Sequence, residues 1–346
     1  MTLTRRRFLL TAARAVAGTT LVLGSQTAMG CGSFPFLPRG KGTVRIGIAG
    51  GTQTLWRYLV RRREEMLRPL GRDVELRPYN TEGDLRQAFL DNQVDIIATL
   101  PPAVPSLIQA GVEAQFFLPI AWIKEGYMFI ARSDLPIQSM SDLAGKPVAI
   151  YPLTHPGFAY WMAFLPRNYG IAVRQLQYRE TDNPEVPLQA GEVWAASVGS
   201  AQWSGLKQTQ KYRKISDLSQ EWRKISGSDE LLMFGGYLAR TSFIQENQDL
   251  IEQFIRVHHE MLKQYKANKQ AVIEAITGDQ AGPYLTREQN EFIAWYLGLD
   301  DVSPERVYIS DHDVRSYEQV YSLLVEGGYL QKAPTSVEAL FYRGKR

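Results

Sequence analysis

The chain of 346 residues has a single cysteine, Cys31, so it can form neither an internal disulfide nor a thiolate metal cluster. It also lacks the short motifs of common catalytic sites: a Gly-x-Ser-x-Gly elbow, a phosphate-binding Gly-Lys-Ser/Thr loop and a His-Glu-x-x-His helix. His258-His259-Glu260 is not expected to bind a metal, because His258 falls on an apolar helix stripe and His259 points elsewhere. We therefore expect a protein that is not an enzyme and holds no metal and no cofactor.

An excess of charge of one sign is lacking as well. The chain has 39 basic and 36 acidic residues, and four of the basic residues are arginines within the first thirty positions, leaving 35 against 36. This balance excludes the electrostatic footprint of a nucleic-acid-binding protein.

The N-terminal thirty residues have the pattern of a secretory signal. Arg5-Arg6 precede Phe8-Leu9. The weakly apolar stretch after them contains glycine, serine and threonine, which make it too polar for a membrane span. The paired arginines resemble the Tat export motif of bacteria. Cys31 follows directly, at a position resembling a lipoprotein cleavage site. We expect a signal peptide over 1–30, a lipid anchor on Cys31 and a tether over 31–42.

Strands and helices alternate through the rest of the chain, which predicts an α/β fold with parallel strand pairs. Alternation of period two predicts a strand at 43–49, and short apolar or strand-like runs predict further strands at 74–79, 94–98, 127–132, 146–151, 176–178, 193–198 and 230–240. Apolar residues at helical spacing predict helices at 55–67, 85–89, 158–165, 250–265, 289–297 and 314–324. Pro166 is expected to kink or end the helix that begins at Phe158.

Four stretches carry a family resemblance. They are Val44 to Thr54, Asn92-Gln93-Val94-Asp95-Ile96, Ser139-Met140-Ser141-Asp142-Leu143-Ala144-Gly145-Lys146 with the two residues before it, and Gln189-Ala190-Gly191-Glu192-Val193-Trp194-Ala195-Ala196. Over residues 43 to 340 the chain resembles the type II periplasmic substrate-binding proteins of ABC importers, in the sulfonate, taurine, nitrate and thiamine-precursor group.

The resemblance implies two α/β lobes with mixed sheets flanked by helices, joined by two hinge strands near 119–130 and 230–240. Lobe 1 would comprise 43–126 and 236–346, and lobe 2 would comprise 127–235. A ligand would lie between the lobes, beyond the carboxyl ends of strands. The implied ligand-binding residues are Gly51, Thr52, Gln53, Thr54, Thr99, Trp122, Thr154, His155, Ser200, Gln202 and Trp203.

The implied function is that of an extracytoplasmic, membrane-anchored and monomeric protein that captures a small organic solute and delivers it to permease subunits. Hydroxyl and amide donors mixed with tryptophan favour a sulfonate-like, taurine-like or ring-bearing solute over bare nitrate. One alternative is a protein that binds a thiamine pyrimidine precursor. A related alternative is a synthase that holds pyridoxal on a lysine, although that enzyme group is cytosolic and carries a cysteine-rich motif. An exported sensor domain that presents its ligand to a receptor is another.

Overall fold

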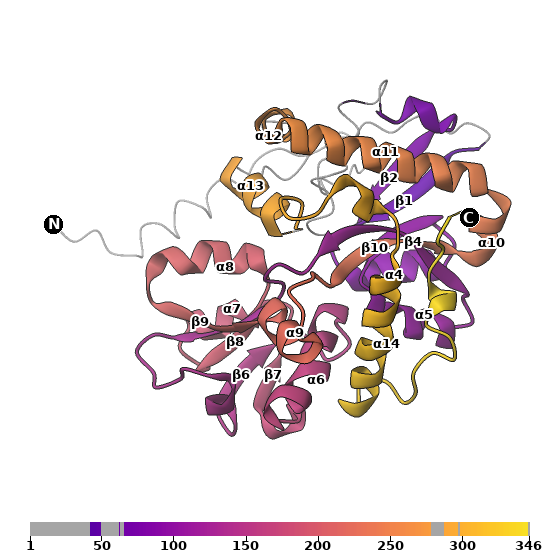
Figure 1. Cartoon of the computed structure of the whole chain (residues 1–346). Coiled ribbons are helices and arrows are strands. Elements are labelled where there is room, and N and C mark those ends of the chain that lie inside the picture. Colours follow the sequence, from indigo (N-terminus) through magenta and orange to yellow (C-terminus); the bar gives the residue numbers. More distant parts are fainter. Residues whose placement is uncertain (1–41, 50–61, 63–65, 278–286, 297, 345–346) are drawn as a thin grey trace, which may run out of the picture.

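The structure is a computed structural model and describes residues 42–49, 62, 66–277, 287–296 and 298–344 (Figure 1). The signal, Cys31, most of the helix predicted at 55–67 and the candidate residues Gly51, Thr52, Gln53 and Thr54 lie outside the described residues.

Two five-stranded mixed sheets form the centres of two lobes (Figure 1). The first sheet has the order β2-β1-β3-β10-β4, with β1 parallel to β2 and β3, and β10 antiparallel to β3 and β4. The second has the order β7-β6-β8-β5-β9, with β6 parallel to β7 and β8, and β5 antiparallel to β8 and β9. The strands are β1 (Val44–Ile48), β2 (Val74–Pro78), β3 (Ile96–Thr99), β4 (Ala114–Trp122), β5 (Met128–Arg132), β6 (Pro147–Ile150), β7 (Gln177–Glu180), β8 (Ala195–Val198), β9 (Tyr212–Asp217) and β10 (Met233–Arg240).

Helices cover both sheets. Around the first sheet lie α4 (Glu82–Leu90), α5 (Val104–Gln109), α10 (Thr241–Glu246), α11 (Gln248–Ala267), α12 (Lys269–Ile276), α13 (Arg287–Tyr296) and α14 (Asp311–Glu326). Around the second lie α6 (Pro156–Tyr169), α7 (Glu185–Gln189), α8 (Ser200–Leu206) and α9 (Leu218–Ser226). We call each sheet with its helices a lobe. Among these described helices, none combines the length and the apolar character needed to cross a membrane.

Local sequence signals explain many of these boundaries. The Thr81 hydroxyl accepts a hydrogen bond from the Asp84 N–H and caps α4, as its spacing predicts. Ser310 and Asp313 form a capping box at the start of α14. Gly145 has φ of 68°, a left-handed conformation that ends the turn before β6 at little steric cost. All eight predicted strands are found, with ends that differ by a few residues.

Pro166 was expected to kink or end its helix, and the helix does not end there. Helix α6 continues through Pro166 to Tyr169 and ends at Gly170, whose φ is 66°. A proline at 166 cannot donate to the carbonyl of Met162, four residues earlier. Gly327 at the end of α14 lies against that carbonyl, and a Cβ at 327 would be 2.0 Å from the Met162 oxygen. The packing of α14 on α6 therefore holds the helix together around the missing bond.

The lobes are joined by two crossovers, residues 123–127 between β4 and β5 and residues 227–232 between α9 and β10. They also share one hydrophobic cluster that includes Phe129 and Trp161 of the second lobe and Tyr317 and Tyr321 of the first. On the other side, α13 of the first lobe packs against α8 of the second. The described lobes are thus in contact on both sides of the crossovers.

Candidate functional site

The carboxyl ends of parallel strands in both lobes provide the candidate site. Thr99 closes β3 in the first lobe, while Tyr151 follows β6 and Gly199 follows β8 in the second. Ligands of open α/β sheets bind at this edge, where loops and helix starts leave room for side chains from several strands.

Four aromatic side chains meet where the crossovers join the second lobe: Tyr127, Tyr151, His155 and Phe234. We call them the aromatic cluster. The Tyr151 and His155 rings stack with centroids 4.8 Å apart, and Tyr127 meets Tyr151 edge-on at 5.4 Å. Phe234 lies 6.0 Å from Tyr127. Tyr127 lies in the first crossover and Phe234 at the start of β10, so the cluster spans both connections between the lobes.

Two glycines allow this close packing. A Cβ on Gly157 would lie 2.2 Å from the Tyr127 ring, so a residue with a side chain there would displace the tyrosine. The Gly199 N–H donates to the Tyr151 hydroxyl at 3.3 Å, which fixes that ring at the end of β8. A Cβ on Gly199 would meet the Gln202 side-chain oxygen at 2.8 Å.

His155 is held neutral in this cluster. Its Nδ1 accepts a hydrogen bond from the Gly157 N–H at 3.1 Å and caps α6. Burial lowers its pKa to about 4, and the charge of Asp182 opposes this only in part. The accepting nitrogen therefore carries no proton, and the imidazole contributes a flat apolar face beside Tyr151 at neutral pH.

On the first lobe, Thr99 is buried and its hydroxyl lies 3.5 Å from a carboxyl oxygen of Glu82. Burial raises the pKa of Glu82 to about 7, and the Thr99 hydroxyl lowers it by a smaller amount.

The other predicted residues are spread along the same rim. Ser200 is buried at the start of α8, Gln202 and Trp203 are half-buried in that helix, and Thr154 is exposed in the turn before α6. Trp203 packs against the apolar residues beneath α8.

Trp122 lies deeper than the rest. It is fully buried at the end of β4, and its indole nitrogen has no hydrogen-bond partner among the described residues. The Arg306 guanidinium lies 5.9 Å from the Trp122 ring.

The structure thus brings His155, Gly199 and Gln202 together, while Thr99 lies at the corresponding edge of the other lobe.

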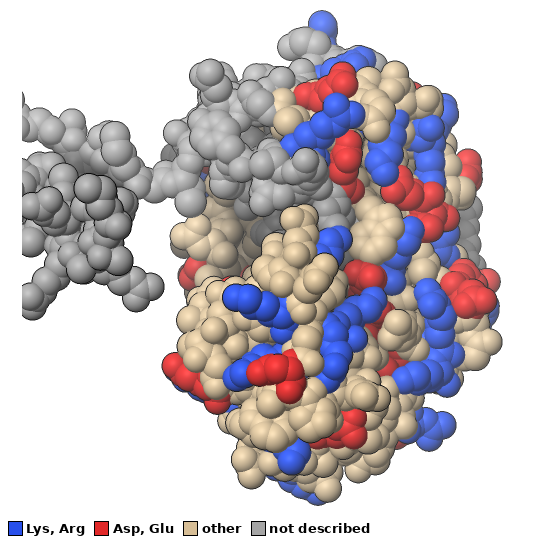
Figure 2. All heavy atoms as spheres, turned by 90° about the vertical axis from the view of Figure 1, so that its left-hand side faces the viewer, with Lys and Arg blue, Asp and Glu red and all other residues tan. Residues whose placement is uncertain are grey.

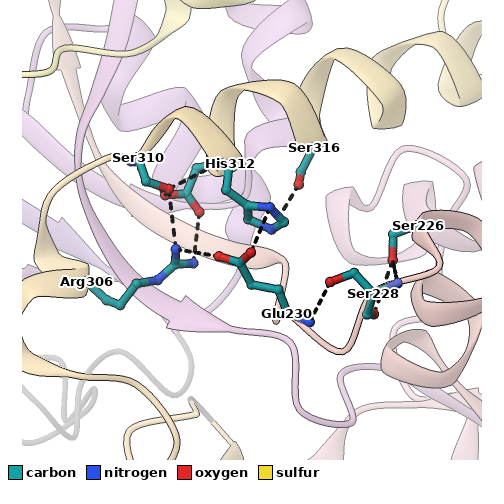
Figure 3. Close-up of polar contacts among 8 residues, drawn as sticks. Ser226, Ser228, Glu230, Arg306, Ser310, His312 and Ser316 are labelled. Atoms are coloured by element: carbon teal, nitrogen blue, oxygen red, sulfur yellow. Dashed lines mark hydrogen bonds and ion pairs between the residues drawn. The ribbon is translucent and has the colours of Figure 1, made fainter.

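Charged side chains fix both crossovers to the first lobe. Lys124 pairs with Asp301 at 2.6 Å and lies over the Trp295 ring. Glu230 pairs with Arg306 at 3.3 Å and with His312 at 3.1 Å (Figure 3). We call these two contacts the crossover clamps.

The second clamp continues into the protein, because Arg306 also pairs with the fully buried carboxylate of Asp313 at 3.1 Å. His312 contacts the Ser316 hydroxyl through its other nitrogen, at 3.2 Å. In the described structure His312 therefore connects Glu230 of the second crossover with Ser316 of α14.

Charge elsewhere on the surface is mixed. On the face drawn in Figure 2, basic and acidic side chains are interspersed over the described surface. Within the described residues no group of three or more histidines, cysteines or carboxylates is arranged to hold a metal ion. An open polar groove between the start of α11 and the turn Arg68–Leu70 lies away from the edge described above.

Sequence reasoning missed Tyr127, Tyr151, Phe234 and Glu82. The first three were taken as strand residues and Glu82 as part of a helix start, and nothing in their local pattern sets them apart. Their meeting depends on the order of strands in the sheets. A signal was available for Gly199, since a glycine directly after a strand often marks a close approach.

Comparison with solved structures shows the fold of periplasmic binding proteins. The aliphatic sulphonate binding protein SsuA of Escherichia coli shares 14% sequence identity, with a TM-score of 0.66 over 88% of this chain and 93% of that one. The alkanesulfonate-binding SsuA of Xanthomonas axonopodis bound to MOPS shares 14%, with a TM-score of 0.62 over 88% and 99%. A ligand-binding component of an ABC-type import system from Staphylococcus aureus shares 13%, with a TM-score of 0.63 over 87% and 96%. No curated protein sequence matches the chain.

These similarities define the class of fold, two α/β lobes with mixed sheets, as expected from the sequence. The family model described as "ABC transporter, phosphonate, periplasmic substrate-binding protein" matches residues 53–275. The chain belongs to this family and is the substrate-binding component of an ABC transporter. Family membership implies an extracytoplasmic location, a small-molecule ligand and a membrane transporter as partner.

Proposed function

We propose that the protein captures a small organic solute with an apolar or planar body and an acidic end, of the phosphonate or sulfonate class, between its two lobes. The observation that carries the proposal is the aromatic cluster at the junction of both crossovers. Aromatic faces supply flat apolar contact area for a ligand body. The family description and the names of the structural neighbours support the acidic end.

A thermal-shift panel tests the proposal, because a specific ligand raises the melting temperature with its concentration above the dissociation constant. The panel contains alkyl and aryl phosphonates, alkyl and aryl sulfonates, amino-substituted members of both series, and nitrate. We expect stabilisation by organic members and loss of most of it in Tyr151→Leu, while Tyr151→Phe retains it. Stabilisation by nitrate alone would contradict the proposal, as would equal responses of Tyr151→Leu and the wild-type protein.

We further propose that lobe 1 comprises 43–126 and 236–346, that lobe 2 comprises 127–235, and that ligand release separates α13 from α8. A spin-label pair at Arg287→Cys and Lys207→Cys, in a Cys31→Ser background, follows that separation. Both sites are exposed at the ends of these helices. A long distance without ligand and a short, narrow one with ligand is expected. One unchanged distance distribution would contradict closure.

The location of the protein completes the proposal. The Arg5-Arg6 pair and Cys31 support Tat export followed by lipid anchoring. The exported protein is expected in the detergent phase of a Triton X-114 separation, and its Cys31→Ser variant in the aqueous phase. Export that persists after Arg5 and Arg6 are replaced by lysine would assign the signal to the Sec route instead.

A further inference from the structure

In the second crossover, two neighbouring residues are bound to opposite lobes. Asp229 pairs with Arg223 of α9, in the second lobe, at 3.5 Å. Glu230 pairs with Arg306 and His312, both in the first lobe (Figure 3). Glu230 is therefore the point at which the crossover becomes part of the first lobe. While this clamp holds, the free part of the crossover ends at Asp229, and release of the clamp extends it towards β10.

One of the two groups that hold Glu230 can change its charge with pH. The Nδ1 of His312 lies 3.1 Å from a Glu230 carboxyl oxygen, and its Nε2 lies 3.2 Å from the Ser316 hydroxyl (Figure 3). A neutral imidazole donates from Nδ1 to the carboxylate and accepts at Nε2 from the hydroxyl. A protonated imidazole donates from both nitrogens, and the hydroxyl turns to accept. Both charge states therefore keep their hydrogen bonds, and protonation adds an ion pair with Glu230.

The other charged side chains around this contact have partners of their own. These pairs are Asp311 with Arg343, Asp313 with Arg306, and Glu305 with His259. Helix α6, which packs on α14, contributes the uncharged Tyr160. Among the described residues, Glu230 is therefore the carboxylate that a charge on His312 would bind directly.

The two crossovers are also bound to each other. The Ile123 N–H donates to the Leu232 carbonyl at 2.8 Å. Ile123 directly precedes Lys124 of the first crossover clamp, and Leu232 follows Glu230 by two residues. A firmer hold on Glu230 therefore restrains both connections between the lobes.

We propose that protonation of His312 tightens the second crossover clamp, so that acidification shortens the free part of the crossover and narrows the range of lobe orientations. Histidine is the side chain whose charge ordinarily changes between about pH 5 and 8. An extracytoplasmic location leaves such a group open to changes in the pH of the surroundings. The inference goes beyond the proposed function and does not depend on which solute the protein binds.

Hydrogen exchange followed by mass spectrometry tests the proposal on the protein without added ligand. Protection of the amides at 228–232 and of Ile123, corrected for the intrinsic exchange rate, should rise about twofold to fivefold from about pH 8 to about pH 5.5. Most of this rise should be lost in about 1 M sodium chloride, which screens a partly exposed ion pair. The spin-label pair at 287 and 207 should also give a narrower distance distribution at the lower pH.

Three variants assign the response to the clamp. His312→Gln keeps a neutral donor for Glu230 and should remove the pH response, and Glu230→Gln should remove it with the histidine in place. His259→Gln is the matched control, because His259 pairs with Glu305 of the first lobe instead of a crossover residue, and it should retain the response. Absence of the response in the wild-type protein, or an equal response in the wild-type protein and His312→Gln, would overturn the inference.

Discussion

The hydroxyls of Tyr160 and Tyr317 lie 2.7 Å apart and join the two lobes in the interior of the protein. Tyr160 belongs to α6 of the second lobe and Tyr317 to α14 of the first. Tyr317 donates to the Met233 carbonyl at 2.5 Å, so its oxygen accepts from Tyr160. Burial raises the pKa of Tyr317 far above its ordinary value, and the pair therefore stays uncharged.

Tyr317→Phe is expected to lower the free energy of unfolding by about 1–3 kcal/mol, because it leaves the buried Met233 carbonyl without its donor. Urea denaturation measures this. Tyr329→Phe, on the loop after α14, is the control and should change stability by less than about 0.5 kcal/mol. Equal effects of the two substitutions would contradict the role of the Tyr160–Tyr317 pair.

Gly327→Ala is expected to destabilise the protein by about 1–3 kcal/mol, since its methyl group would overlap the Met162 carbonyl. The neighbouring Gly328→Ala has open space at its Cβ but a φ of 76°, so its cost is conformational and about 1 kcal/mol. Double substitution with Pro166→Ala separates the two effects. The alanine at 166 restores a donor to Met162 and should compensate little of the steric overlap at 327.

The second crossover clamp contains one arginine with two carboxylate partners of different burial. Glu230 is exposed by about half, whereas the side chain of Asp313 is fully buried. Glu230→Gln is therefore expected to cost less than about 1 kcal/mol of unfolding free energy. Asp313→Asn should cost about 3 kcal/mol, because it removes the capping box and leaves Arg306 with the weaker partner. Raising the salt concentration should reduce the first effect much more than the second.

The stability of the protein should depend on pH through buried histidines, whose pKa is lowered, and through Glu82, whose pKa is raised. The pKa of His155 and of His258 is lowered to about 4 by burial, so the unfolded chain binds more protons between pH 6.5 and 4 and stability falls as the pH falls through this range. His155→Asn keeps a helix-capping side chain and should flatten this dependence.

The raised pKa of Glu82 acts in the other direction. The folded protein binds more protons between pH 4.5 and 7, so stability falls as the pH rises through this window. Glu82→Gln should therefore raise the melting temperature at pH 8 and leave it unchanged near pH 4. An increase of the same size at both pH values would contradict the titration of Glu82.

Eight of the ten described strands, and the long helices α6, α11 and α14, could be predicted because their residues follow the spacing of buried strands and amphipathic helices. Strand β9 and helix α9 were not predicted, since Tyr212–Asp217 is mostly half-buried and α9 buries few apolar residues. Of the kink or end expected at Pro166, the end did not occur, because a tertiary contact with Gly327 outweighed the local preference of proline. Tyr151, Phe234 and Glu82 were out of reach because their proximity depends on strand order, which hydrophobic periodicity does not specify.

Tyr127 and Phe234 belong to the aromatic cluster, and they also sit where the chain passes between the lobes. A solute bound on these rings, as we propose, would contact the two backbone segments that connect the lobes. Binding of the solute and closure of the lobes would then depend on the same residues. A transporter that reads the outer surfaces of both lobes would sense the loaded state without touching the cargo.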